Sequence, residues 1–264
     1  MIVFGAIAPH GDPVFAEGSL TGQALGELGR SLERARPDAI VLATPHNVHV
    51  EGSFAVVVAA TLAGSLEEQG FAAPGVRLSS RVDRELAAAL LGSLRAARLP
   101  AVGMSFGSND PELAEMPMDW GTLIPLWFLG ARGEEALPVV VVSPCRERSL
   151  EDHVAAGRAI AAASDGRRVA FVASADHGHA HDPDGPFGFD PASTEYDARV
   201  VELVAGNRLA DVLSLEPIVQ AASADSLWQM AMLHGALGDG FRSELLSYER
   251  PTYFGMLVAS YEPT

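Results

Sequence analysis

Histidines gather directly behind apolar runs in this 264-residue sequence. The segment SADHGHAHDPDGPFG, residues 174–188, places three of the eight histidines within five positions. Others follow the runs IVFGAIA (2–8) and AIVLAT (39–44). The histidines that stand behind these runs are His10, His46, His49, His177, His179 and His181. Imidazole can ligate a metal or carry a proton near neutral pH, so these positions could support either chemistry.

Two of these histidines follow proline, in the contexts APH for His10 and TPH for His46. Proline ends a strand and restricts the residue before it, so each imidazole stands on a rigid support. Two neutral imidazoles suit iron, zinc or manganese, and a carboxylate would complete a facial set of ligands. We therefore favour His10 and His46 as metal ligands over the alternative, in which each is a loop residue bonded to a backbone carbonyl.

We predict other roles for the remaining histidines, His49, His153 and His234. We expect His49 to orient a neighbouring side chain of the site. His153, among the charged residues of LEDHVAAG, is predicted to lie on a solvated helix face. His234, in MAMLHGAL, is predicted to be a core or helix-end residue rather than a ligand.

The elements that must position these groups alternate along the chain. Short, nearly continuous apolar runs indicate strands buried on both faces, at 2–8, 39–44, 54–60, 138–143 and 168–174. Helical patterns lie at 20–36, 79–97, 119–131, 149–164, 193–206 and 225–237. This alternation predicts one α/β domain over residues 1–264, with a mostly parallel central sheet and helices on both faces. The segment 243–260 is expected to add two strands as an antiparallel edge.

Parallel strands share one edge for their carboxyl ends, and ligands bind there. The first, second and last of the predicted core strands each deliver at least one histidine to that edge. We therefore expect these imidazoles to lie close together in the fold.

Composition excludes several classes of function. The formal net charge of −16, without a basic stripe, argues against nucleic acid and membrane surfaces as partners. The start MIVFGAIAPHGD lacks a basic segment and is too short to span a bilayer, so we expect neither a signal peptide nor a membrane helix. The single cysteine, Cys145, favours a reducing cytoplasm. The sequence shows no dinucleotide-binding glycine motif, no Walker loop and no serine-hydrolase elbow.

Several motifs in order resemble the class III extradiol ring-cleavage dioxygenases. The similarity is to the catalytic-subunit type related to protocatechuate and aminophenol dioxygenases and to the Memo-like proteins. The matching segments are APHGD, TPHNVH, DWGTLIPLWFL, SADHGHAHDPDGPFGFDP, EYDARVVELV and DSLWQMAMLHGAL.

The resemblance implies a non-haem Fe(II) bound by His10 and His46. It places the third ligand, a carboxylate, at the start of the late helix, where we assign Asp225; its alternative role is that of helix N-cap. It also makes His179 the acid–base residue. One of its neighbours, His177 or His181, then assists while the other meets solvent.

One position departs from the family pattern. Trp120 stands where the family commonly has a histidine, and an indole cannot accept a proton. Either His177 or His49 substitutes for it, or the pocket suits a different substrate and Trp120 packs beside an aromatic ligand. Asp12 and Asp176 are candidate partners that fix imidazole tautomers, with turn formation as the alternative role.

The implied activity is extradiol cleavage of a catecholic or 2-aminophenolic ring, with O₂ as co-substrate and His177 and His179 as catalytic residues. One alternative is a hydrolase or lyase that uses zinc at the same ligands; manganese also suits them. A second alternative is a non-catalytic, Memo-like metal-binding interaction protein. The family often forms homo-oligomers, and the oligomeric state of this chain stays open.

Overall fold

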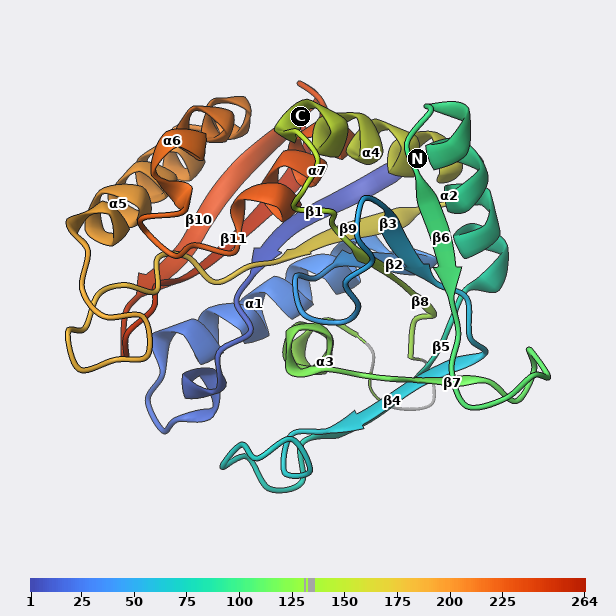
Figure 1. The fold of residues 1–264 in the computed structure, drawn as a ribbon, viewed down its shortest axis with the longest axis horizontal. Helices are drawn as coiled ribbons and strands as arrows, with labels where there is room; N and C mark the ends of the chain where they lie inside the picture. The colour runs from blue at the N-terminus through green and yellow to red at the C-terminus, as the bar shows by residue number, and fades with distance from the viewer. Residues whose placement is uncertain (131, 133–135) are drawn as a thin grey trace.

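A twisted central sheet separates two layers of helices in the computed structural model, which describes residues 1–130, 132 and 136–264 (Figure 1). Within the described residues, the strand order of this sheet is β10-β11-β1-β9-β2-β8-β3-β6. Its strands are β1 (Ile2–Ala8), β2 (Ala39–Ala43), β3 (Phe54–Val57), β6 (Ala101–Met104), β8 (Val139–Ser143), β9 (Val169–Ser174), β10 (Phe241–Glu249) and β11 (Met256–Pro263).

The centre of the sheet is parallel. β1, β9, β2 and β8 run side by side in one direction, in registers such as Ala6 with Val172 and Leu42 with Val141. β11 joins β1 antiparallel, and β10 pairs antiparallel with β11, so the predicted antiparallel edge is confirmed. The carboxyl ends of four neighbouring parallel strands therefore meet at one edge.

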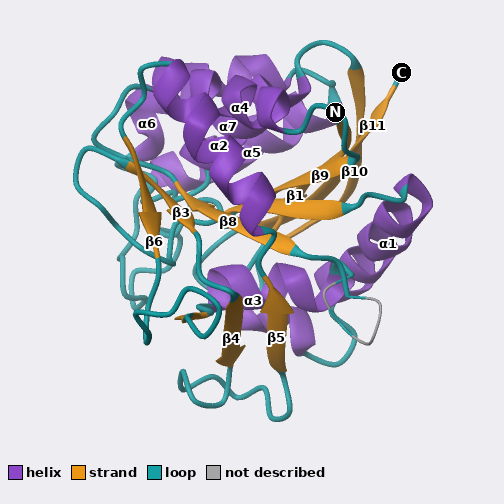
Figure 2. Ribbon diagram, turned by 90° about the vertical axis from the view of Figure 1, so that its right-hand side faces the viewer, coloured by secondary structure: helices purple, strands orange, loops and turns teal. Residues whose placement is uncertain are grey.

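Helices cover both faces of this sheet, as Figure 2 shows. One face carries α2 (Arg84–Ala96), α4 (Leu150–Ala163), α5 (Pro191–Ala205), η2 (Leu209–Leu215), α6 (Glu216–Val219) and α7 (Leu227–Leu237). The other carries η1 (Asp12–Phe15), α1 (Leu20–Ala35), α3 (Trp120–Phe128) and a small sheet of β4 (Thr61–Ser65), β5 (Arg77–Arg81) and β7 (Glu115–Pro117).

Two apolar cores result, because the central strands are buried on both faces. Val41 and Phe171 point into the core beneath α4 and α7, whereas Ile40 and Val172 point into the core beneath α1 and α3. Alternate residues of one strand face opposite sides of a sheet, which explains why these strands are apolar without interruption.

Two predicted helices and one predicted core strand differ from the structure by three or more residues at one end, and the elements η1, β4, β6, β7, η2 and α6 were not predicted. The helix expected over 79–97 begins at Arg84, because residues 77–81 form the strand β5. Exposed and buried residues alternate along β5, so one face of this strand lies in solvent. The side chain of Asp83 caps this helix by accepting the Leu86 N–H. The helix expected over 119–131 ends at Phe128, and residue 131 lies outside the described residues. The strand expected over 54–60 ends at Val57.

No helix in the described part of the chain is both long enough and apolar enough to cross a membrane.

Candidate metal centre

The carboxyl edge of the parallel strands gathers the polar residues of the site. His10 stands two residues after β1, Asp176 two residues after β9, and His46 three residues after β2. Because β9 lies between β1 and β2, these residues are neighbours in space despite their separation in sequence. Asp225 reaches the same place from the loop that enters α7.

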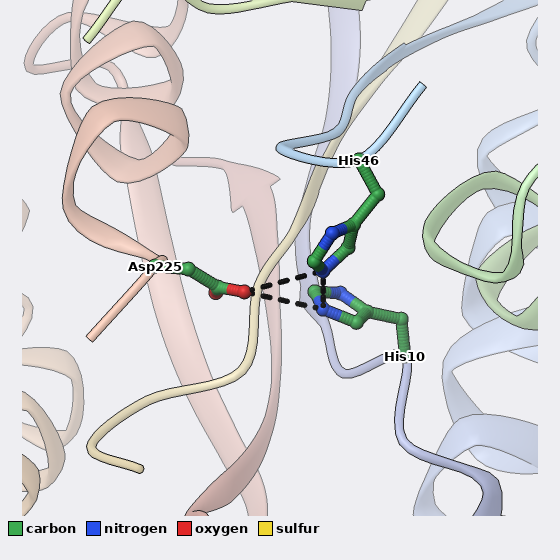
Figure 3. A group of neighbouring side chains, drawn as sticks. All are labelled: His10, His46 and Asp225. Carbon is green, nitrogen blue, oxygen red and sulfur yellow. Dashed lines mark hydrogen bonds and ion pairs between the residues drawn. The ribbon is translucent and has the colours of Figure 1, made fainter. Parts of the chain in front are cut away.

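Three of these side chains point at one another (Figure 3). The Nε2 atoms of His10 and His46 lie 3.0 Å apart, and the rings meet edge to face. The Oδ2 of Asp225 lies 3.5 Å from the first of these nitrogens and 3.4 Å from the second. We call His10, His46 and Asp225 the triad.

These separations fit coordination of one ion. Metal–ligand bonds of about 2.1 Å that stand about 90° to 110° apart separate two ligand atoms by roughly 3.0 to 3.4 Å. Two imidazole nitrogens and one carboxylate oxygen are also the donor set of facial sites that keep open positions. The donor chemistry and the distances both agree with a bound divalent metal ion.

Hydrogen bonds determine which nitrogen of His10 can bind a metal. The Ser174 hydroxyl donates to the backbone carbonyl of Gly121, which can only accept. Since that hydroxyl has no second proton, it accepts a hydrogen bond from Nδ1 of His10 at 3.0 Å. Nδ1 therefore carries hydrogen, and Nε2 directs its lone pair to the triad, as expected when a second group orients a metal-binding histidine.

The surrounding carboxylates make the site attractive to positive charge. Burial alone would lower the pKa of His10, but Asp176 and Asp225 raise it to about 9. Asp176 accepts the His10 backbone N–H at 3.1 Å, and its Oδ2 lies 3.4 Å from Nε2. Although burial opposes it, the two histidines hold the pKa of Asp225 well below its usual range. Without a metal, a proton on His10 supplies the cation that these carboxylates attract.

His46 is held by the start of α3. Asp119 caps this helix by accepting the Thr122 N–H at 3.0 Å, and Trp120 follows at the first helical position. The Trp120 ring packs on His46 with centroids 4.5 Å apart. A Cβ at Gly121 would lie 3.0 Å from the His46 ring and 2.6 Å from the Thr44 hydroxyl, so glycine permits this close approach.

Asp225 does not cap α7. The capping position is Ser226, which makes no side-chain cap hydrogen bond, and Asp225 precedes it. Asp225 is buried, and its second oxygen, Oδ1, has no hydrogen-bond partner among the described residues. A buried carboxylate without neutral donors requires a positive partner, which supports a ligand role over the capping alternative.

His179 lies at the same edge with one nitrogen engaged. Its Nδ1 is 2.7 Å from the backbone carbonyl of His177, which only accepts, so Nδ1 donates and Nε2 keeps a lone pair. Phe254 stacks on the ring at 5.3 Å, and Phe187 meets it edge to face at 5.3 Å. These contacts hold a half-buried imidazole with a free basic nitrogen.

The expectation that His177 or His181 meets solvent is wrong, because both are buried. His177 bonds through Nδ1 to Ser226 at 3.0 Å, and burial lowers its pKa to about 4. His181 pairs with the buried Asp197 at 2.9 Å. Asp197 also accepts the Gly178 N–H at 2.7 Å, so it anchors the loop that carries these histidines.

The other predicted residues form no hydrogen bond or ion pair with the triad in the described structure. His49 is 62% exposed, and its Nε2 lies 3.2 Å from Glu147, so the side chain that it contacts is not part of the triad. Asp12 begins η1, and no hydrogen bond joins its carboxylate to a triad imidazole among the described residues. His234 is a half-buried residue in the last turn of α7, as expected.

The prediction for His153 is wrong. It is fully buried, bonds through Nδ1 to the Ser149 carbonyl at 2.8 Å and packs against Phe54. Its face of α4 lies against the sheet core, and burial lowers its pKa to about 4.

Two supporting residues were missed by sequence reasoning. Ser174 is the last residue of β9, where a polar residue ending an apolar strand was the available signal. Asp197 lies on the buried face of α5, one residue after the buried Tyr196, so an acidic residue within the apolar face of a helix was its signal.

The sequence matches the family described as the catalytic LigB subunit of aromatic ring-opening dioxygenase over residues 12–259. It is similar to Protein CA_C1420 of Clostridium acetobutylicum, with 23% identity over 232 residues that cover 87% of this chain and 49% of that protein. The chain thus spans about half the length of this curated relative.

Among solved structures, the fold resembles that of the uncharacterized protein JW3007 from Escherichia coli K12. The TM-score is 0.65 at 18% identity, and the match covers 98% of this chain and 99% of the other. This likeness supports the α/β architecture.

Proposed function

Because the chain belongs to the family of catalytic LigB subunits of aromatic ring-opening dioxygenases, we propose that it is an Fe(II)-dependent extradiol dioxygenase. Its substrate is a catecholic or 2-aminophenolic ring, and its co-substrate is O₂. His10, His46 and Asp225 hold the metal in this proposal.

The observation that carries the proposal is the geometry of the triad. Three ligand atoms from distant parts of the chain lie 3.0 to 3.5 Å apart and face one another. The second ring nitrogen of His10, Nδ1, is not free to bind a metal, because it donates a hydrogen bond to Ser174. Fe(II), when bound, would supply open coordination positions for the ring substituents and for O₂ and would let electrons pass between them.

His179 supplies the base. Its Nδ1 donates to the His177 carbonyl, so Nε2 can take the proton of a phenolic hydroxyl and return it later. The stacked ring of Phe254 holds the imidazole in place, so this nitrogen keeps a defined direction.

Aromatic groups provide the surroundings that such a substrate needs. Trp120 packs on His46, and Tyr253 lies 6.0 Å from the His179 ring. Trp120 can shape the pocket but cannot accept a proton, so proton transfer falls to His179. His177, whose Nε2 has no partner among the described residues, is a second residue proposed for the reaction.

The overall reaction requires no further reductant. The ring carbon–carbon bond next to the pair of substituents breaks, whether these are two hydroxyls or a hydroxyl and an amino group, and both atoms of O₂ enter the product. The proposal also includes a cytoplasmic location, which the free cysteine Cys145 supports, because a reducing compartment favours free thiols.

Purification without oxygen, followed by metal analysis and O₂ uptake with catechol and 2-aminophenol panels, tests the proposal. We expect about one equivalent of iron per chain and uptake that depends on the aromatic compound. Zinc in place of iron, with no uptake after iron loading, would instead favour a zinc hydrolase or lyase. Bound iron without turnover of any such compound would favour a metal-binding interaction protein.

His179→Ala tests the acid–base role. Activity should fall by about 10²- to 10⁴-fold while iron content is unchanged. His234→Ala, at the far end of α7, is the matched control and should keep both. Loss of iron from His179→Ala would show that His179 is a ligand and that the assigned role is wrong.

A further inference from the structure

We propose that Tyr248, on the edge strand β10, is a positioning residue that holds His179 in place through the buried carboxylate of Asp197. This inference rests on the proposed function, in which His179 is the base, and it adds a residue that lies outside the site. Among the described residues, no hydrogen bond or ring contact joins Tyr248 to His179 directly, so its influence passes through Asp197.

A β-bulge directs Tyr248 toward Asp197. The pairing of β10 with β11 shifts by one residue between Leu245 and Ser247, so the residues after the shift change faces of the sheet. Tyr248 is thereby paired with Leu257, whose side chain lies in the core on the α5 side of the sheet. Asp197 is a buried residue of α5. Bulges often re-aim a side chain next to a functional site, and this bulge turns Tyr248 to the face that holds Asp197.

The Asp197 carboxylate joins Tyr248 to the loop that carries His179. Its Oδ2 accepts the Tyr248 hydroxyl at 2.6 Å and lies 2.9 Å from Nε2 of His181, whereas its Oδ1 accepts the Gly178 N–H at 2.7 Å. Gly178 precedes His179 directly and His181 follows it by two residues, so the carboxylate holds the chain on both sides of the imidazole. Burial and the charge of Asp197 raise the pKa of Tyr248, so its hydroxyl keeps the proton that it donates.

The same carboxylate also sets the position of Phe254, the ring that stacks on His179. A Cβ at Gly255 would collide with Oδ2 of Asp197, so only glycine lets the backbone lie against the carboxylate at this point. Gly255 donates its N–H to the Gly178 carbonyl at 3.1 Å, which ties the two loops together. Because Phe254 precedes Gly255, the imidazole and its stacking partner depend on the same anchored pair of loops.

The Tyr248 hydroxyl matters because the carboxylate that it reaches is buried. Asp197 is only 2% exposed, whereas Tyr248 is 36% exposed. Without this hydroxyl, Oδ2 keeps only its contact with His181 among the described residues. Hydrogen bonds to a charged group are stronger than those between neutral groups, so the loss of one should make local opening of the histidine loop about tenfold more frequent.

Tyr248→Phe tests the proposal, since it removes the hydroxyl and keeps the ring. Tyr261→Phe, on the neighbouring strand β11, is the matched control, because the Tyr261 hydroxyl is buried and has no hydrogen-bond partner in the described structure. Hydrogen exchange of the purified chain, followed by mass spectrometry, reports on peptides over residues 175–182. We expect about tenfold faster exchange there in Tyr248→Phe, no change over β2, and no change at either place in Tyr261→Phe.

Steady-state kinetics on the iron-loaded protein give a second readout, with the catechol or 2-aminophenol that the wild-type chain cleaves. In Tyr248→Phe, kcat should fall about tenfold, because a displaced base transfers the proton less often. KM and iron content should stay at their wild-type values, since Tyr248 supports neither the substrate nor the triad. Tyr261→Phe should keep all three.

The outcomes separate the two proposals. Unchanged exchange over residues 175–182 in Tyr248→Phe, or faster exchange there with an unchanged kcat, would overturn the positioning role. Equally faster exchange over β2 would show a global loss of stability and would overturn it too. If the wild-type chain cleaves no such ring while exchange over residues 175–182 still rises only in Tyr248→Phe, the dioxygenase proposal fails and the hold of Tyr248 on the His179 loop stands.

Discussion

Replacing Ser174 with alanine should weaken metal binding without removing any ligand. Ser174 is fully buried and connects Nδ1 of His10 to the carbonyl of Gly121. In the alanine variant, the imidazole loses the acceptor that keeps hydrogen on Nδ1. The ring can then rotate or change tautomer, and Nε2 is no longer directed to the triad.

The magnitude follows from the bonds that disappear. One buried acceptor, the Gly121 carbonyl, and one buried donor, Nδ1–H of His10, each lose their partner in the described structure. Each unsatisfied group costs about 1 to 3 kcal/mol, and loss of a group that orients a metal-binding histidine typically weakens metal affinity by about 10- to 100-fold. We expect Ser174→Ala to lie in that range.

Competition titration with a chromophoric chelator, using cobalt or zinc at fixed pH, measures this effect without any assay of turnover. Ser164→Ala is the matched control, because Ser164 is equally buried and donates to the Ile160 carbonyl within α4 at 2.8 Å. Both variants should unfold at lower denaturant concentration than the wild-type chain. Only Ser174→Ala should lose metal affinity.

An unchanged metal affinity in Ser174→Ala, with the same loss of stability as the control, would refute the reasoning. It would mean that packing alone orients His10 and that the hydrogen bond to Ser174 has only a structural role.

Three further perturbations probe the triad and the loop that carries His177, His179 and His181. Metal affinity should rise with pH up to about 9, the raised pKa of His10, because the ion must displace a proton there. Because folding raises the pKa of His10 from 6.5 to about 9, the protonated imidazole stabilises the metal-free fold, and this stabilisation is complete below pH 6.5. It should disappear as the pH rises through about 9. Denaturant titrations of the metal-free protein across this pH range measure the loss. Gly121→Ala should weaken metal binding, because the added Cβ displaces His46. This loss is expected although alanine stabilises a helix by about 1 kcal/mol relative to glycine. An unaltered metal affinity in a chelator titration would contradict the close packing at this glycine. Asp197→Asn should lower the free energy of unfolding by about 3 kcal/mol, because it removes the charge that pairs with the buried His181. A loss below about 0.5 kcal/mol would show that Asp197 does not anchor the histidine loop.

The architecture could largely be predicted because its signals are local. The runs that became β1, β2, β8 and β9 are short and rich in β-branched residues, and they are apolar apart from the serines that end β8 and β9, as is typical of strands covered on both faces. The small sheet was missed because its strands carry weak signals. β5, with the sequence RLSSR, contains one apolar residue, because the second of its two buried positions is Ser80.

Part of the site was also accessible. The matching Pro-His contexts indicated His10 and His46, and the structure brings their nitrogens to 3.0 Å. Asp225 could be proposed only through family resemblance, because an aspartate before a helix is also a common cap. The burial of His153 was not predictable from its charged sequence neighbours, since the residues it packs against come from another part of the chain.

The sequence by itself determined which segments become strands and helices and which strand ends carry imidazoles. Tertiary structure alone decided which of those groups meet. The sheet inserts β9 between β1 and β2, so residues near positions 10, 46 and 176 become neighbours, and the loop before α7 adds Asp225. Local patterns report the burial and direction of one element. The order in which strands pair depends on how all the elements pack together, and that order sets the distances on which chemistry depends.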